Sequence, residues 1–351
     1  MPVFSHEALR HLGSEIFLAL GAPKEEASLV ADLLVRANLA GVDSHGIIRI
    51  PSYVKEIEEQ RILPGSKPKI VKDTPTITIV DGNRGFGQVV ALKAMELTIE
   101  KAGRQGMAAT GAYNCGHIGR LADYAMMAAE RDMVGMVMTP GGRWVAPWGG
   151  REAILGISPF SVAMPAGKYK PFVLDMSSGV AAAGKIRVKA VRGEKLPLGW
   201  IINKDGKPTT NPEDLEKGGA ILPIGGNVGY KGYGLSLIVE LMCGPLLGFK
   251  NLTKGPGKGI FMMALNIEDF TPIEEFKAGV DAYIETIKAS RLAEGYKEIL
   301  IPGEPEFRED ERRRREGIYV EEATWNEILT IARKLKVEMD YVKPLHGGWV
   351  L

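Results

Sequence analysis

The stretch TITIVDGNRGFGQVVALKAMELTIEKAGRQGMAATGAY, residues 76–113, contains the pattern that decides the fold. Its first residues, 76–80, are rich in β-branched side chains and predict a strand. Residues 88–106 predict a helix closed by glycine, and residues 107–113 predict a second strand. A helix of this length between two strands indicates an α/β layer built on a sheet.

The same mixture continues along the chain. IGRLADYAMMAAERD (118–132) predicts a second helix and MVGMVMT (133–139) a third strand. The apolar stretches FSVAMPA, PFVLDM, GLSLIVELM and GIFMMALNI follow without a strict βαβ rhythm. We therefore expect a mixed sheet in an α/β domain.

Nucleotide and zinc fingerprints are absent from the sequence. GFGQVV, GYGLSL and GPGKGI each lack the third glycine of G-x-G-x-x-G, and no Walker-type glycine loop occurs. H-E-x-x-H and paired C-x-x-C motifs are also missing. A standard Rossmann domain and a metal site are therefore not predicted.

The two ends of the chain have a different character. Residues 6–40 predict two amphipathic helices around LGAPKEEA, with Gly41 ending the second helix, and residues 304–341 predict a charged helical tail. The Pro/Gly-rich break LPGSKPK suggests a boundary. We expect a helical segment at 1–70, an α/β cofactor-binding domain at 71–300 and a helical segment at 301–351 that returns to the first one.

Composition limits the class of partner. The 351 residues carry a net charge of +1, so the overall field favours neither nucleic acid nor an anionic membrane. The run Arg312–Arg315 lies among acidic residues and predicts a solvated helix face. Two cysteines and the lack of a secretory signal or a spanning segment lead us to expect a cytoplasmic protein.

The first candidate site is VDSHGIIRIPSYV, residues 42–54. If the chain is helical from Ser44, His45 and Arg49 lie on one face. Arginine binds a carboxylate through two hydrogen bonds, and histidine exchanges a proton with a neighbouring oxygen. Ser44 and Tyr53 would then contact the same substrate. The alternative is a helix-start serine with a surface histidine, and Tyr53 in the core.

Two further clusters follow predicted strands. His117 of NCGHIGR comes after the strand at 107–113, at the start of the next helix, where the helix dipole favours neutral imidazole. Asp175, Met176 and Ser177 of VLDMSSG end another strand and suit ribose hydroxyls or a phosphate. The ordinary alternatives are a hydrogen-bonded turn for His117 and a helix N-cap for Asp175.

Taken together, the motifs resemble a known family. GVDSHGIIRIPSYV, NCGHIGRLADYAMMAAE, PWGG, DMSSGVAAAGKI, GWIINKDGKPTTNPEDL, GGNVGYKGYGLSLIVELMCGPLLG and PGE occur in the order seen in the type 2 malate/L-lactate dehydrogenase family. That family includes ureidoglycolate, sulfolactate and 2,3-diketogulonate oxidoreductases, and the resemblance covers about residues 5 to 335. It implies a nicotinamide-dependent homodimer with a non-Rossmann fold and an active site in a cleft between domains.

The resemblance also implies roles for residues. His45 and His117 are the acid–base candidates, with the proton assigned to His117, and Arg49 grips the substrate carboxylate. The cofactor, NAD or NADP, is expected to contact residues of four separate motifs: Gly141, Asp175, Met176, Ser177, Lys231, Pro302, Gly303 and Glu304. The expected reaction is hydride transfer between the cofactor and a 2-hydroxy acid such as malate or L-lactate.

Some features leave alternatives open. The family commonly has MTNS and GTNP where this chain has MTPGG and GISP, so a cofactor contact near Gly141 is expected from the backbone alone, with Arg143 as a possible substitute. Lys185, Arg187 and Lys189 either meet a 2′-phosphate or form an exposed basic face. The substrate is alternatively a cyclic imine carboxylate, and a nucleotide-binding regulator is the non-enzymatic alternative.

Overall fold

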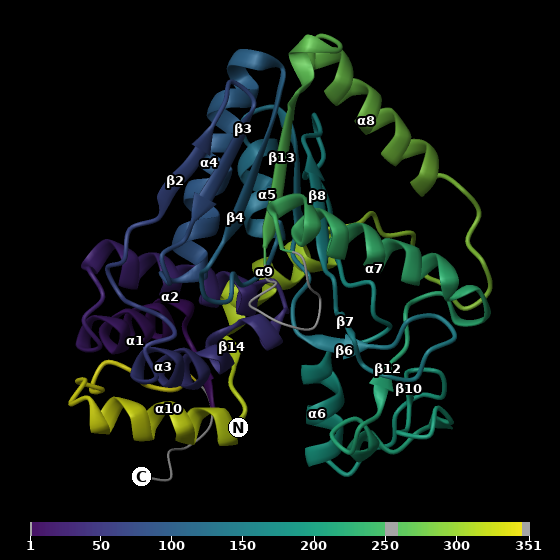
Figure 1. Ribbon diagram of the computed structural model, residues 1–351. Coiled ribbons are helices and arrows are strands. Elements are labelled where there is room, and N and C mark those ends of the chain that lie inside the picture. The colour runs from purple at the N-terminus through teal and green to yellow at the C-terminus, as the bar shows by residue number, and fades with distance from the viewer. Residues whose placement is uncertain (1, 250–258, 346–351) are drawn as a thin grey trace.

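The computed structural model describes residues 2–249 and 259–345, and its centre is a sheet of seven strands (Figure 1). The spatial order is β2-β3-β4-β13-β5-β8-β9. The strands span Lys69–Asp73 (β2), Ile77–Asp81 (β3), Met107–Tyr113 (β4), Met133–Met138 (β5), Phe160–Met164 (β8), Phe172–Met176 (β9) and Ile260–Asn266 (β13). Within the described residues β3 and β4 are the one parallel pair of this sheet, so the sheet is mixed, as predicted.

The register of the sheet collects four strand ends at one edge. β13 runs antiparallel to both β4 and β5, and β8 runs antiparallel to both β5 and β9. Strands β3, β4, β5 and β9 therefore point the same way, and the loops that follow them share an edge. This edge carries the segments after Tyr113, Met138 and Met176, in which the candidates His117, Gly141 and Ser177 lie.

Two helices cover the sheet and form its core. α4 (Gly87–Gln105) makes the crossover between β3 and β4, and it ends at Gly106, whose φ of 79° suits glycine. α5 (Ala122–Ala129) packs beside α4 through alanine faces, which allow close approach. α5 begins four residues later than the predicted helix at 118–132, because Gly119 has a φ of 76° and interrupts a helical path.

The two terminal segments share a second core (Figure 1). It contains α1 (His6–Ala19), α2 (Lys24–Leu39), α3 (Ile50–Glu58) and α10 (Glu322–Lys334). β1 (Val3–Phe4) pairs with β14 (Ile318–Tyr319), and the ring centroids of Phe4 and Trp325 lie 4.1 Å apart. The expected α/β fold with a helical unit built from both ends of the chain is confirmed.

A smaller sheet, which the sequence did not predict, lies between β5 and α7 in the chain. Its order is β11-β10-β12-β6-β7, with α6 (Ala183–Val191) packed against it. The strands span Arg143–Val145 (β6), Leu155–Gly156 (β7), Ile201–Ile202 (β10), Pro208–Thr209 (β11) and Ala220–Ile221 (β12). The remaining helices are α7 (Tyr230–Cys243), α8 (Ile273–Lys288) and α9 (Glu304–Glu316). None of the helices in the described residues is long and apolar enough to cross a bilayer.

Candidate active site

The segment that carries Ser44, His45 and Arg49 is not one helix. Two single 3-10 turns, Asp43–His45 and Ile47–Arg49, are separated by Gly46 in an extended conformation, and α3 starts only at Ile50. The expectation of a helix from Ser44 is therefore wrong. The break arises because the Asn38 side chain accepts the Ile47 N–H at 2.8 Å, and a Cβ on Gly46 would lie 2.1 Å from that oxygen.

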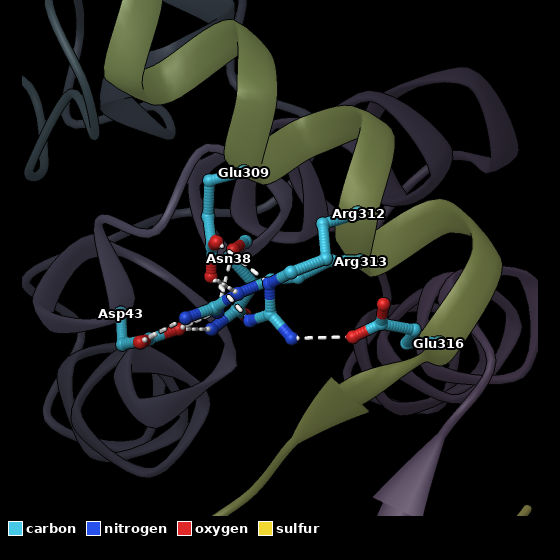
Figure 2. Close-up of polar contacts among 6 residues, drawn as sticks. All are labelled: Asn38, Asp43, Glu309, Arg312, Arg313 and Glu316. Atoms are coloured by element: carbon cyan, nitrogen blue, oxygen red, sulfur yellow. Dashed lines mark hydrogen bonds and ion pairs between the residues drawn. The ribbon is translucent and has the colours of Figure 1, made fainter. Parts of the chain in front are cut away.

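Arg313 of α9 forms hydrogen bonds to this segment and to the end of α2 (Figure 2). The Arg313 guanidinium donates to both oxygens of Asp43, at 2.6 and 3.0 Å, and to the Asn38 carbonyl at 2.7 Å. Its Nε donates to Glu309 at 2.5 Å. The Arg313 side chain is only 13% exposed, so the expectation that the whole run Arg312–Arg315 is a solvated face is wrong for this member.

His45 is half-buried, and the charges of two arginines act on it. Its Nδ1 lies 2.9 Å from the Ser44 hydroxyl, and Arg49 Nε donates to the Ser44 carbonyl at 2.7 Å. Burial lowers the pKa of His45 to about 4, and the charges of Arg49 and Arg120 act in the same direction. His45 is therefore neutral at neutral pH. Among the described residues no hydrogen bond or ion pair involves the terminal nitrogens of Arg49, so they remain available for an anion.

His117 stands beside His45 at the sheet edge. The two ring centroids lie 5.3 Å apart with 34° between the ring planes. His117 Nδ1 lies 2.8 Å from the Tyr53 hydroxyl and 3.3 Å from the Gly119 nitrogen. α5 starts five residues after His117, so its expected position at a helix start is wrong and the dipole argument does not apply.

Tyr53 lies behind His117. Its side chain is 1% exposed, and its hydroxyl accepts a hydrogen bond from the Gln88 amide nitrogen at 2.8 Å. Burial raises the pKa of Tyr53, so the hydroxyl stays protonated over the working pH range. This placement argues against the expected direct contact between Tyr53 and substrate, because the hydroxyl is already engaged by two protein groups.

Asp175 joins the end of β9 to the His117 loop. Its carboxylate accepts the Ala122 N–H at 2.8 Å, at the first residue of α5. The N-cap residue of α6, the helix that follows β9, is Ala182, so the alternative of an ordinary N-cap for Asp175 is wrong. The surrounding protein raises the pKa of Asp175 to about 6, mainly by desolvation, although the residue is exposed at the end of β9. The Arg120 charge acts on both Asp175 and His45, which places the two candidate clusters around one cation.

The other cofactor candidates border the same strand. The Pro302 carbonyl accepts the Val173 N–H at 3.1 Å, and Gly303 has a φ of 98° as it opens α9. Glu304 forms an ion pair with Lys288 at 2.8 Å. Beside this turn lies a hollow of about 260 Å³, lined in part by Lys168, Lys170, Pro302, Glu304 and Arg308. The Ser177 hydroxyl bonds to the Gly179 carbonyl, Met176 is half-buried at the end of β9, and Lys231 is exposed at the start of α7.

The segments MTPGG and GISP, which depart from the family motifs, contact each other. The Ser158 N–H donates to the Pro140 carbonyl at 2.8 Å, and the buried Glu240 carboxylate accepts from Gly156 N and Ser158 Oγ. Gly141, with a φ of 70°, follows Pro140 in this loop, and a Cβ there would meet nothing closer than 3.8 Å. Arg143 is exposed on β6.

The three basic residues on α6 have separate environments. Arg187 pairs with Glu216 at 2.8 Å, Lys189 pairs with Glu194 at 2.7 Å, and Lys185 is exposed. Two of them are thus paired with acids, which favours the basic-face alternative. In the described part of the chain, no group of three or more His, Cys, Asp or Glu side chains is arranged to hold a metal ion.

Comparison with known proteins identifies the family. The family model described as malate/L-lactate dehydrogenase matches residues 4–329. A malate dehydrogenase of Pyrococcus abyssi is 42% identical over 334 residues, which cover 92% of each chain. The chain belongs to this family. As a member of the malate/L-lactate dehydrogenase family it is an oxidoreductase, and the family predicted from the motifs is confirmed.

Solved structures of the malate/L-lactate dehydrogenase family share the fold. The sulfolactate dehydrogenase from Methanocaldococcus jannaschii has a TM-score of 0.88 and 37% identity, covering 97% of this chain and 99% of that one. A delta1-piperideine-2-carboxylate reductase from Pseudomonas syringae has a TM-score of 0.81 and 26% identity, covering 95% and 100%.

Sequence reasoning missed three groups that shape the site, namely Asn38, Gln88 and Arg313. Each acts through a hydrogen bond to a residue remote in the chain, with separations of 9, 35 and 270 residues to Ile47, Tyr53 and Asp43. The one available signal was that Asn38 and Gln88 are polar residues on otherwise apolar helix faces, a pattern typical of buried polar contacts.

Proposed function

We propose that this protein is an NAD(P)-dependent dehydrogenase of 2-hydroxy acids such as malate, L-lactate or sulfolactate. The observation that supports the proposal is the pairing of His45 and His117, 5.3 Å apart, beside an arginine whose terminal nitrogens are available. This set matches a substrate that carries a carboxylate next to a hydroxyl or carbonyl group. The names of its relatives as malate and sulfolactate dehydrogenases support the same substrate class.

The residues at the end of β9 and around α9 fit a dinucleotide. Asp175 provides a carboxylate for ribose hydroxyls, Ser177 and Lys231 provide a hydroxyl and a cation, and the hollow beside Pro302–Glu304 provides space. Asp175 accepts the N–H of Ala122, the first residue of α5, and His117 lies in the loop five residues before it, so a cofactor held at Asp175 would come near the histidines. The nicotinamide, when bound, supplies the hydride acceptor or donor.

The protein residues divide the remaining work. Arg49 binds the substrate carboxylate bidentately and fixes the orientation of the carbinol carbon. His117 takes the hydroxyl proton as the carbonyl forms, because the Tyr53 hydroxyl supports its other nitrogen. His45 has a pKa of about 4 and stays neutral, so it donates a hydrogen bond from its single ring N–H to the substrate oxygen and does not take up the substrate proton. Tyr53 is reassigned from substrate contact to support of His117.

Steady-state kinetics with purified enzyme test the proposal. The absorbance of the reduced cofactor is followed with malate, lactate, sulfolactate and a cyclic imine carboxylate, each with NAD(H) and NADP(H). We expect His117→Ala to lower kcat about 100- to 10,000-fold and Arg49→Ala to raise KM with a smaller loss of kcat. A His117→Ala enzyme with wild-type kcat across pH would contradict the proton assignment.

A cyclic imine carboxylate remains the second candidate substrate, because a piperideine-2-carboxylate reductase has the same fold. Reduction of C=N instead of C=O in the same panel distinguishes the two. Failure of all substrates, with cofactor binding retained, would favour the nucleotide-binding regulator.

We further propose that the active form is a cytoplasmic homodimer. α7 exposes Ile238 and Leu241 at 51% and 55%, an apolar surface of the kind that subunit interfaces cover. Sedimentation analysis of the mass in solution tests this assembly.

A further inference from the structure

We propose that Gln88 is a positioning residue that sets, through the Tyr53 hydroxyl, which nitrogen of His117 carries a proton. The inference deepens the proposed function, since it rests on His117 as the proton carrier. It starts from a chain of two hydrogen bonds in which Gln88 Nε2 and His117 Nδ1 each lie 2.8 Å from the Tyr53 oxygen. All three side chains come from different elements, α4, α3 and the loop after β4.

The amide of Gln88 can either donate a hydrogen bond to the Tyr53 hydroxyl or accept one from it. It is fully buried, and its oxygen has no hydrogen-bond partner in residues 2–249 and 259–345. The oxygen and nitrogen ends of an amide occupy nearly the same volume, so a half-turn of the amide exchanges a donor for an acceptor at the same place. Tyr53 can therefore either accept a hydrogen bond from Gln88 and donate one to His117, or accept one from His117 and donate one to Gln88.

Catalysis needs the second arrangement. To take a proton from substrate, His117 must present a lone pair at Nε2, and a neutral imidazole does so only when Nδ1 carries the hydrogen. The Nδ1–H group then donates a hydrogen bond to the Tyr53 oxygen. After a half-turn of the Gln88 amide, the Tyr53 hydroxyl donates to the Gln88 oxygen. The Gly119 N–H, 3.3 Å from Nδ1, favours the opposite tautomer. Gln88 shifts the balance because its oxygen can accept the hydrogen bond that the Tyr53 hydroxyl must then donate.

The backbone fixes this chain of groups in place. Gly87, the first residue of α4, lies against the turn at His117, since a Cβ there would come within 2.2 Å of the Gly116 carbonyl and 2.4 Å of the His117 carbonyl. Gly87, the second glycine of GFGQVV, thus allows the start of α4, and with it Gln88, to pack against the loop that contains His117. The variants tested below leave the other charged and titratable groups near His117 unchanged. These groups are His45 on the neighbouring turn and the two cations that act on it, Arg49 and Arg120.

Nitrogen-15 NMR of histidine side chains in the free enzyme tests the inference without substrate or cofactor. We expect Gln88→Met, of similar volume, to move His117 toward the Nε2–H tautomer and to lower kcat about tenfold with little change in KM. Gln88→Glu offers an acceptor and a negative charge, so it favours Nδ1–H and raises the His117 pKa by about one unit. In a Tyr53→Phe background the Gln88 substitutions have no further effect on His117.

Thr98→Val serves as the matched control. Thr98 is another buried polar residue of α4, bonded to the Ala94 carbonyl and to Thr110 and remote from His117 in the chain. It shares any effect on helix stability but leaves the His117 signals unchanged. The inference is overturned if folded Gln88→Met and Gln88→Glu enzymes keep the wild-type tautomer and pKa of His117. Absence of dehydrogenase activity in the wild type would refute the proposed function while leaving this NMR result to be judged on its own.

Discussion

Replacing Arg313 by methionine is expected to loosen the segment that carries His45. The guanidinium donates two hydrogen bonds to Asp43 and one to the Asn38 carbonyl, and it is largely enclosed. Truncating one partner of a fully buried ion pair costs about 3–5 kcal/mol. Asp43 is 53% exposed and can be rehydrated, and the Asn38 carbonyl keeps the Gly41 N–H, so we expect a loss of about 2 kcal/mol.

Arg312→Met is the control for this change. Arg312 is the next residue on α9 and also pairs with Glu309, but it is 48% exposed and points to Glu316 instead of Asp43 (Figure 2). Exposed pairs contribute about 0–1 kcal/mol. Both variants remove one positive charge and the pairing with Glu309, which is two hydrogen bonds for Arg312 and one for Arg313. Arg312→Met also removes the exposed pair with Glu316, so a larger loss in Arg313→Met reports the link to Asp43 and Asn38.

Two measurements follow the effect. Urea unfolding, with coincident circular dichroism and fluorescence transitions, gives the change in free energy of unfolding. Hydrogen exchange gives the local effect, and the Ile47 N–H, which donates to Asn38, is expected to exchange faster in Arg313→Met alone. We also expect KM for the hydroxy acid to rise on the order of tenfold, since Arg49 loses its fixed position. Equal losses in both variants, or unchanged exchange at residues 43–49, would refute the reasoning.

Two further predictions concern Asp175 and Gly46. The pKa of Asp175 is raised from 3.8 to about 6, so its contribution to stability is lost as pH rises through that window; His45, lowered from 6.5 to about 4, contributes stability that is lost as pH falls. Asp175→Asn removes the first effect, and urea unfolding between pH 4 and 6.5 should then show a steeper rise of stability with pH; an unchanged slope would argue against it. Gly46→Ala forces the Asn38 side chain away and should cost about 2–3 kcal/mol, whereas Gly279→Ala on α8, with nothing within 4 Å, should be neutral or stabilising in the same assay.

Local sequence patterns predicted the elements of the large sheet well. The strands at 77–81, 107–113 and 133–138 and the helix at 87–105 lie within one residue of the predicted ranges. Each is specified by its own period and by terminators such as Gly106. The small sheet was missed because four of its five strands contain only two residues each in the described chain, too few for any period to appear.

The sequence predicted which histidines belong to the candidate site but not how the backbone arranges them. His45 and His117 do meet at the sheet edge, yet both helical arguments for them fail. Gly46 and Gly119 break the expected helices. Part of the reason lies outside the local sequence, in the Asn38 side chain beside Gly46 and in Gly87, which packs against the loop that contains His117. Contacts such as Arg313 with Asp43 join residues 270 apart, and a single sequence contains no signal for such a pairing.

These long-range contacts explain why the proton work divides as proposed. Hydrogen bonds from Arg313 of α9 to Asn38 and Asp43 hold the turn that carries His45. Burial and the charges of Arg49 and Arg120 keep its imidazole neutral. His117 belongs to the sheet edge instead, where Tyr53 and Gln88 give its Nδ1 a partner in either protonation state. A histidine whose hydrogen bonds can reverse is suited to gain and lose a proton, and one held among cations is suited to stay uncharged. The two roles thus follow from which part of the fold supports each ring.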